Sequence, residues 1–264
     1  MQRFVRGAHS LDRAARNMSS SRGAPGLIFP GCGIFFWWQA GALEGLSKRL
    51  DLSAMRFSGA SGGALTATLA ACNVTDYEKS LDVALRLCYE AGVFERGTFG
   101  LRGIWGAMVR MWLHEVLPSD AAARCSNRVF IKLHRPLLGG SLVSEWTSRD
   151  DLIDACMASV HVPLFMDGAL TASFRGASYV DSDLTRALGF QRGALELALP
   201  DDAPSVKISR GRDKRLREKY SSTTDTLRLA SPEGVREMIR WGEEHIDELD
   251  AANVLCPLNS ARRK

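Results

Sequence analysis

The sequence predicts an α/β fold in which helices cover both faces of a mainly parallel sheet. Short apolar strand candidates alternate with helical segments along most of the chain, and this alternation is typical of parallel sheets. Glycine-rich turns at 30–33 and 59–63 each stand between a strand candidate and a helix. The 264 residues, 45% of them hydrophobic, are enough to bury a full core around one sheet.

The individual elements follow from apolar runs, caps and turn residues. The predicted strands are short apolar stretches, at 27–29, 55–58, 129–133, 141–145, 178–180, 195–199 and 206–209. The predicted helices follow the turn at 30–33 and occupy 64–72, 75–90, 101–116, 148–157 and 231–249. Thr75 and Glu78 have the spacing of a capping box, and Ser231 precedes a proline at the first helical position.

One uncharged stretch, 23–43, has the composition of a membrane-spanning segment. The turn at 30–33 divides it into a short strand and the start of a helix. Each half is too short to cross about 30 Å of hydrocarbon. We therefore expect no transmembrane span, and a buried strand–turn–helix unit in its place.

Composition narrows the classes of function. The net charge of +4 is mild and gives no indication of nucleic-acid binding. The six cysteines are scattered and none forms a C-x-x-C pair, so neither a zinc site nor a redox motif is predicted. They are expected to be small buried residues in a reducing, intracellular compartment. No cluster of metal ligands stands out, and no metal or other cofactor is expected.

The N-terminal residues 1–25 differ from the rest of the chain. They contain five arginines and one acidic residue, with apolar residues along one face of a helical wheel. This pattern is typical of a transit peptide for a chloroplast or mitochondrion; a disordered leader and a basic helix on a membrane surface are the alternatives. No compact apolar region follows the charged start, so secretion is not expected. Residues 26–264 are expected to form a single domain with a helical tail from about residue 230.

Ser61 is the leading candidate for a catalytic residue. It is the serine of a G-x-S-x-G motif at 59–63, which places a nucleophile on a strained turn between a strand and a helix. Gly59, Gly62 and Gly63 supply the small neighbours that such a nucleophile elbow needs, and the following helix N-terminus favours negative charge. A glycine-rich turn of a nucleotide-binding fold is the alternative.

Two further positions have the groups that serine chemistry needs. The N–H groups of Gly31, Cys32 and Gly33 follow a strand and can hold an oxyanion or a phosphate. Asp181 ends an apolar strand and can accept the serine proton. His161 is another candidate base, although a histidine flanked by apolar residues more often belongs to the core.

The order and spacing of these motifs resemble the patatin-like phospholipases, in particular the adiponutrin-like branch. The resemblance rests on Gly31–Gly33, Gly59–Gly63, the stretch 148–165 with Ala158-Ser159, and the segment Phe174–Asp181, which occur in the family's order. A fainter likeness continues through the terminal helix to about Leu249. It implies a three-layer α/β/α sandwich around the parallel sheet.

The same resemblance assigns roles to the residues. Ser61 is then the nucleophile of a Ser–Asp dyad, Asp181 its base, and the N–H groups around Cys32 and Gly33 the oxyanion hole. The implied reaction is hydrolysis of fatty acyl esters in phospholipids, galactolipids or acylglycerols. The implied partner is the lipid itself, at a peripheral membrane or lipid-droplet surface.

The chain also departs from the family pattern. It has Asp-Ser-Asp at 181–183 where the family usually has Asp-Gly-Gly or Asp-Gly-Ala, and Phe36 stands where many relatives have glycine. A literal Asp-Gly-Ala upstream makes Asp167 a second candidate base. Two alternatives therefore stay open: a catalytically inactive lipid-binding relative, and a Ser-His-Asp esterase or acyltransferase that uses His161.

Two segments have both an ordinary and a functional interpretation. Residues 207–219 contain seven basic and two acidic residues, which suits either a solvated loop or attraction to anionic lipid headgroups. The helix at 101–116 has Trp105, Met108 and Trp112 on its apolar face. These side chains suit either core packing or lipid entry.

Overall fold

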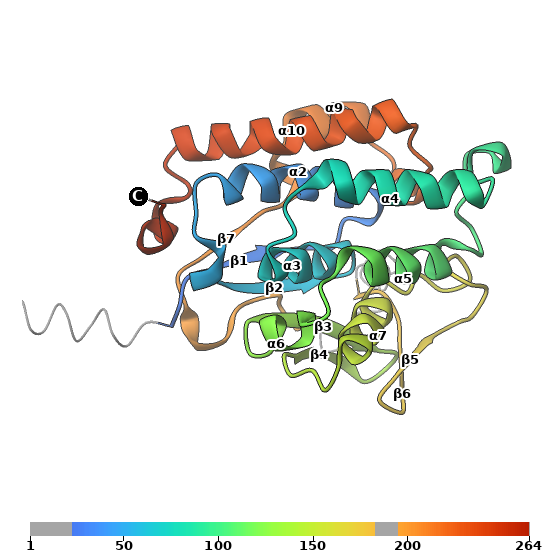
Figure 1. Cartoon of the computed structure of the whole chain (residues 1–264), viewed down its shortest axis with the longest axis horizontal. Helices are drawn as coiled ribbons and strands as arrows, with labels where there is room; N and C mark the ends of the chain where they lie inside the picture. The colour runs from blue at the N-terminus through green and yellow to red at the C-terminus, as the bar shows by residue number, and fades with distance from the viewer. Residues whose placement is uncertain (1–22, 183–194, 264) are drawn as a thin grey trace, which may run out of the picture.

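The computed structural model describes residues 23–182 and 195–263 and is built around one five-stranded sheet (Figure 1). The strands occur in the order β4-β3-β2-β1-β7. Their bounds are β1 (Gly26–Phe29), β2 (Arg56–Ala60), β3 (Val129–Arg135), β4 (Gly139–Val143) and β7 (Ser205–Lys207). All neighbours pair in parallel except β4, which runs antiparallel to β3. Residues 1–22 of the leader expected at 1–25, and Asp183, lie outside the described residues.

Helices flank this sheet, and the three-layer α/β/α fold is confirmed. α3 (Gly62–Cys72) packs across β1, β2 and β3, and α7 (Arg149–Ser159) packs on β3. α2 (Phe36–Ser47) lies against α3, with α10 (Pro232–Ala251) along its outer side (Figure 1). The remaining α-helices are α4 (Tyr77–Glu90), α5 (Trp105–Val116), α6 (Ala121–Cys125) and α9 (Lys214–Lys219). The short 3-10 helices are η1 (Gly33–Phe35), η2 (Leu52–Ala54), η3 (Phe94–Arg96), η4 (Pro200–Asp202), η5 (Arg210–Arg212), η6 (Thr223–Leu227) and η7 (Cys256–Ala261).

Small residues allow the two innermost helices to be buried. Every residue of α3 is buried, and the helix consists mainly of glycine, alanine and threonine. α2 and α10 approach so closely that a Cβ on Gly41 would lie 1.8 Å from the Ile239 carbonyl oxygen, and one on Gly242 would lie 2.0 Å from that of Trp38. No other residue fits at such a contact, so these two glycines fix how the C-terminal helix docks on the core.

The uncharged stretch 23–43 forms β1, the turn and the start of α2, as the sequence predicts. β1 is buried throughout, and nearly all of the following helix is buried as well. Within residues 23–182 and 195–263, no helix combines the length and apolar character that crossing a membrane requires.

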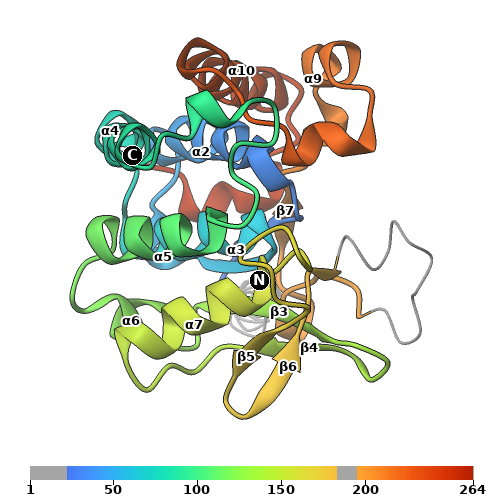
Figure 2. The same cartoon turned by 90° about the vertical axis from the view of Figure 1, so that its right-hand side faces the viewer.

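The predicted strand at 178–180 lies in a hairpin and not in the parallel sheet. β5 (Ala172–Phe174) and β6 (Ala177–Tyr179) pair antiparallel beside α7 (Figure 2). Arg175 and Gly176 both have positive φ, 46° and 75°, which suits a two-residue hairpin turn. Val180 then bridges to His134 of β3, where its N–H donates to the His134 carbonyl at 3.0 Å. This bridge brings the next residue, Asp181, to the sheet.

Two smaller expectations were wrong. α4 is capped by Asp76, whose carboxylate accepts the Lys79 N–H at 3.3 Å, because aspartate one residue after Thr75 is the better acceptor for the first turn. Residues 195–199 form no strand. Leu197 and Leu199 lie across the sheet face against Ile28, so their side chains are buried without joining the hydrogen-bonded ladder.

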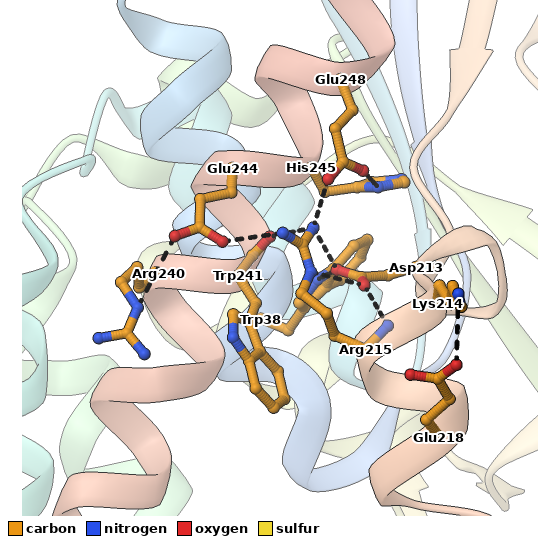
Figure 3. A network of polar contacts seen from close by, with 10 residues as sticks. All are labelled: Trp38, Asp213, Lys214, Arg215, Glu218, Arg240, Trp241, Glu244, His245 and Glu248. Carbon is orange, nitrogen blue, oxygen red and sulfur yellow. Dashed lines mark hydrogen bonds and ion pairs between the residues drawn. The ribbon is translucent and has the colours of Figure 1, made fainter.

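A polar network around the buried Asp213 joins α10 to the core (Figure 3). The carboxylate of Asp213, whose side chain is 1% exposed, accepts the indole N–H of Trp38 at 2.8 Å and pairs with Arg215 at 3.0 Å. Arg215 also contacts Glu244 at 2.8 Å and Glu248 at 3.1 Å, both on α10. α2, α9 and α10 are therefore held together by charge as well as by close packing.

Candidate functional site

Two glycine turns meet at the carboxyl edge of the parallel strands, and the register between β1 and β2 sets how far each turn extends beyond the sheet. Phe29 of β1 pairs with Gly59 of β2, so Gly31 and Ser61 each stand two residues beyond a paired position. Binding groups of open α/β sheets gather at this edge. The sequence-predicted oxyanion turn and nucleophile elbow are thus neighbours.

Ser61 has the backbone of a strained elbow. Its φ of 52° and ψ of −132° lie outside the regions that residues with a side chain usually adopt. The turn is so tight that a Cβ on Gly59 would lie 2.3 Å from the Gly63 carbonyl oxygen. The Ser61 N–H donates to the hydroxyl of Ser159 at 2.9 Å, and that hydroxyl donates to the Lys132 carbonyl at 2.8 Å. The sequence analysis places Ser159 in a stretch that resembles the family but predicts no role for its side chain.

The side chains of Ser61 and Asp181 meet although they are 120 positions apart in the sequence. The Ser61 hydroxyl donates a hydrogen bond to Oδ2 of Asp181. Both residues are almost fully buried, at 5% and 4% exposure. The main chain orients Asp181 as well, because its N–H donates to the His161 carbonyl at 2.7 Å. A carboxylate in this position can accept the serine proton.

The other two candidate bases make different contacts. The ring of His161 is buried, and its Nε2 lies 3.2 Å from the Ala169 carbonyl oxygen. Asp167 is exposed and its carboxylate accepts the Ala169 N–H at 2.9 Å, which closes its own turn. Neither side chain has a hydrogen bond to Ser61 in the described part of the chain. The geometry therefore favours Asp181 among the three.

The candidate oxyanion turn at 31–33 and the turn that holds Ser61 are in close contact. Gly33 has a φ of 55°, and a Cβ there would lie 2.3 Å from the Thr226 carbonyl oxygen. A Cβ on Gly62 would lie 2.8 Å from Sγ of Cys32 and 3.5 Å from the Gly33 nitrogen. The starts of η1 and α3 are therefore adjacent. Because the first N–H groups of a helix have no acceptor within it, they can stabilise negative charge here.

A cavity of about 350 Å³ adjoins Ser61 and Asp181. Its walls are mostly apolar side chains from α2, α4 and α5 and from the segment around η6. Those from the helices include Phe36, Trp37, Leu81, Ala84, Leu85, Leu87, Cys88, Trp105, Met108, Val109 and Trp112. The apolar face of α5 thus lines this cavity, with Met108 and Trp112 also buried. The size and lining suit a hydrocarbon chain.

The charge inside the cavity is sparse. Burial raises the pKa of the Cys88 thiol to about 11, so this side chain is neutral at physiological pH and adds apolar surface. Among the described lining residues, the acidic and basic side chains are Asp181 and Arg210. His134 lies on the neighbouring strand, where burial and the charge of Lys132 lower its pKa and favour the neutral ring.

No group of three or more potential metal ligands occurs among residues 23–182 and 195–263. The arrangement present there is a serine, a carboxylate, helix N-termini and an apolar cavity. Such a set of groups is able to perform acyl transfer through the serine oxygen.

Comparison with known proteins identifies the family. The family model described as Patatin-like phospholipase matches residues 27–190, and the chain belongs to this family. It is 32% identical over 163 residues to an omega-hydroxyceramide transacylase of Mus musculus, and this alignment covers 60% of this chain and 27% of the relative. It is 34% identical over 163 residues to a 1-acylglycerol-3-phosphate O-acyltransferase of Mus musculus, with 60% and 39% covered. It is 28% identical over 166 residues to human patatin-like phospholipase domain-containing protein 4, with 61% and 65% covered.

These matches confirm the resemblance to patatin-like phospholipases and their adiponutrin-like branch. The matched region spans less than half the length of the first two relatives. Family membership supports lipid acyl chemistry, either hydrolysis or acyl transfer.

Proposed function

We propose that the protein cleaves fatty acyl esters of glycerolipids through a Ser–Asp dyad of Ser61 and Asp181. The observation that carries the proposal is the hydrogen bond from the Ser61 hydroxyl to the Asp181 carboxylate, beside an apolar cavity of about 350 Å³. Family membership supports the lipid as substrate. The substrate is met at a membrane or lipid-droplet surface, because acyl glycerolipids are concentrated there.

The proposed reaction has two displacements. Asp181 accepts the Ser61 proton while the serine oxygen attacks the acyl carbonyl carbon, and N–H groups at Cys32, Gly33 and Gly62 hold the resulting oxyanion. The ester C–O bond breaks, and the leaving alcohol takes the proton from Asp181. Water then attacks the acyl-enzyme with Asp181 again as base, which releases the fatty acid and restores Ser61. Oxyanion donors of this kind contribute about 10²–10³ in rate.

Transfer of the acyl group to an alcohol is a second candidate for the last step. Two of the relatives bear names of acyl-transfer enzymes, an omega-hydroxyceramide transacylase and a 1-acylglycerol-3-phosphate O-acyltransferase. The buried dyad favours such transfer, because a lipid alcohol that fills the apolar cavity excludes water from the acyl-enzyme.

The test is turnover of a phospholipid, a galactolipid and a triacylglycerol in mixed micelles, with and without monoacylglycerol as acceptor. Ser61→Ala should abolish both fatty acid release and diacylglycerol formation. Asp181→Asn should lower turnover by about 10²–10³, which lies within the usual contribution of general base catalysis. His161→Gln should keep most of the turnover. Loss of turnover in His161→Gln with retention in Asp181→Asn would contradict the dyad and favour a histidine triad.

A further inference from the structure

Arg210 stands at the same edge of the sheet as the candidate oxyanion turn. Ile28 of β1 pairs with Lys207 of β7, so Gly31 and Arg210 each lie three residues beyond that pair on adjacent parallel strands. Arg210 begins η5 and is one of the residues that line the cavity beside Ser61 and Asp181. Its position is therefore set by the sheet.

The guanidinium of Arg210 has no carboxylate partner in the described part of the chain. The contact that it makes there is with the buried ring of Phe35, whose centroid is 4.4 Å away. Arg215, five residues on, instead has three carboxylates around it. Stacking on an aromatic ring holds a guanidinium in place while its N–H groups stay available to an anion.

We propose that Arg210 binds a phosphate group on the lipid substrate and so makes the site selective for acidic glycerolipids over neutral ones. This inference rests on the proposed function. Arg210 is the one cation among the described lining residues, and Asp181 in the same cavity repels an anion, so an acidic lipid needs a compensating positive charge. The planar guanidinium matches two phosphate oxygens at once.

The kinetic test compares lysophosphatidate with monooleoylglycerol, which share one oleoyl ester and differ in the phosphate. Both are presented in neutral detergent micelles. Arg210→Gln should lower kcat/KM for lysophosphatidate by about 10- to 100-fold, the contribution of a charge-assisted hydrogen bond, mainly through KM. It should change kcat/KM for monooleoylglycerol far less, and Arg210→Lys should be intermediate. Arg212→Gln is the matched control, because Arg212 is exposed and does not line the cavity.

Equal losses for both lipids in Arg210→Gln would overturn the proposal and indicate that Arg210 only supports Phe35. The proposal would also be overturned if Arg212→Gln lowered kcat/KM for lysophosphatidate relative to monooleoylglycerol as much as Arg210→Gln does. If the wild type hydrolyses monooleoylglycerol as well as lysophosphatidate, the proposed function stands and only the inference about Arg210 is wrong.

A binding measurement keeps the inference testable if the protein proves inactive. Ether analogues of the two lipids lack the ester, so calorimetric titration of them reports binding without turnover. The wild type should bind the phosphate-bearing ether more tightly, and Arg210→Gln should lose the preference. Equal binding of both ethers by the wild type would overturn the proposal. Arg210-dependent binding of inorganic phosphate without any preference between the ethers would overturn it too, because the ligand would then be free phosphate and not a headgroup.

Discussion

The main-chain N–H of Ser61 donates to the hydroxyl of Ser159 at 2.9 Å, and this one hydroxyl also donates to the carbonyl of Lys132. The last residue of α7 therefore fixes the elbow to β3. Since the Ser61 N–H is engaged here, the proposed oxyanion has to be held by other N–H groups. We propose the N–H groups at the start of η1 and at Gly62 for this role.

Replacement of Ser159 by alanine should weaken both the fold and the reaction. Ser159 is 2% exposed, so its loss leaves the Ser61 N–H and the Lys132 carbonyl each without this buried partner. We expect the free energy of unfolding in urea to fall by about 1–3 kcal/mol, with slower fatty acid release. Ser178→Ala, on the exposed side of β6, is the control. Unchanged stability and rate in Ser159→Ala would show that the link is unimportant.

Addition of a methyl group at Gly62 should disable the proposed oxyanion hole. The new Cβ would meet Sγ of Cys32 at 2.8 Å, which pushes the start of η1 away from the elbow. We expect Gly62→Ala to lower kcat by about 10²–10³ with a folded protein by circular dichroism. The double variant with Cys32→Ala removes the sulfur and should recover part of the rate. Full activity in Gly62→Ala would place the oxyanion elsewhere.

A larger side chain on α4 should shorten the acyl chain that the site accepts. Ala84 lines the cavity and is partly buried, so a phenylalanine there fills space that a hydrocarbon chain would use. Ala84→Phe should lower kcat/KM for a palmitoyl ester far more than for a butyryl ester of the same alcohol. The butyryl ester is the internal control for folding and chemistry. Equal effects on both esters would argue against this cavity as the acyl site.

The network around Asp213 should make stability depend on pH. Burial opposes ionisation of this carboxyl, but hydrogen bonds from Arg215 and Trp38 outweigh it and lower its pKa. Because the pKa of Asp213 is lower in the folded state, its ionisation stabilises the protein at pH values above its unfolded-state pKa of about 3.9. This stabilisation is lost as the pH falls through the folded-state pKa. Asp213→Asn should therefore cost about 3 kcal/mol in unfolding free energy at neutral pH.

Urea unfolding from neutral pH to about pH 3 checks this, and the difference from wild type should shrink at the acid end. Asp120→Asn is the control, because its pair with Arg124 is exposed and such pairs contribute about 1 kcal/mol or less. A difference that stays constant with pH would contradict the role given to ionised Asp213.

Local patterns predicted the elements and motifs of this fold well. The apolar run before 30–33 corresponds to β1, the G-x-S-x-G motif to the tight turn between β2 and α3, and the Ser231 cap to the start of α10. These signals are local, because caps, turns and periodicity depend on neighbours in the sequence.

The contacts that sequence patterns could not supply are long-range. Ser159 and Arg210 reach the candidate site from α7 and η5, and a serine at a helix end or an arginine in a basic run has no distinguishing local pattern. The sequence also predicts a strand at 178–180 without indicating that it pairs in a hairpin, because a three-residue apolar run does not encode its partner.

The central claim is that Ser61 is a nucleophile activated by Asp181, and a fluorophosphonate probe tests it most directly. Purified protein without residues 1–22 is incubated with the probe, and the labelled residue is located by mass spectrometry. We expect labelling at Ser61, absent in Ser61→Ala and strongly slowed in Asp181→Asn. A folded wild type that takes up no probe would contradict the claim and indicate a lipid-binding relative without catalytic activity.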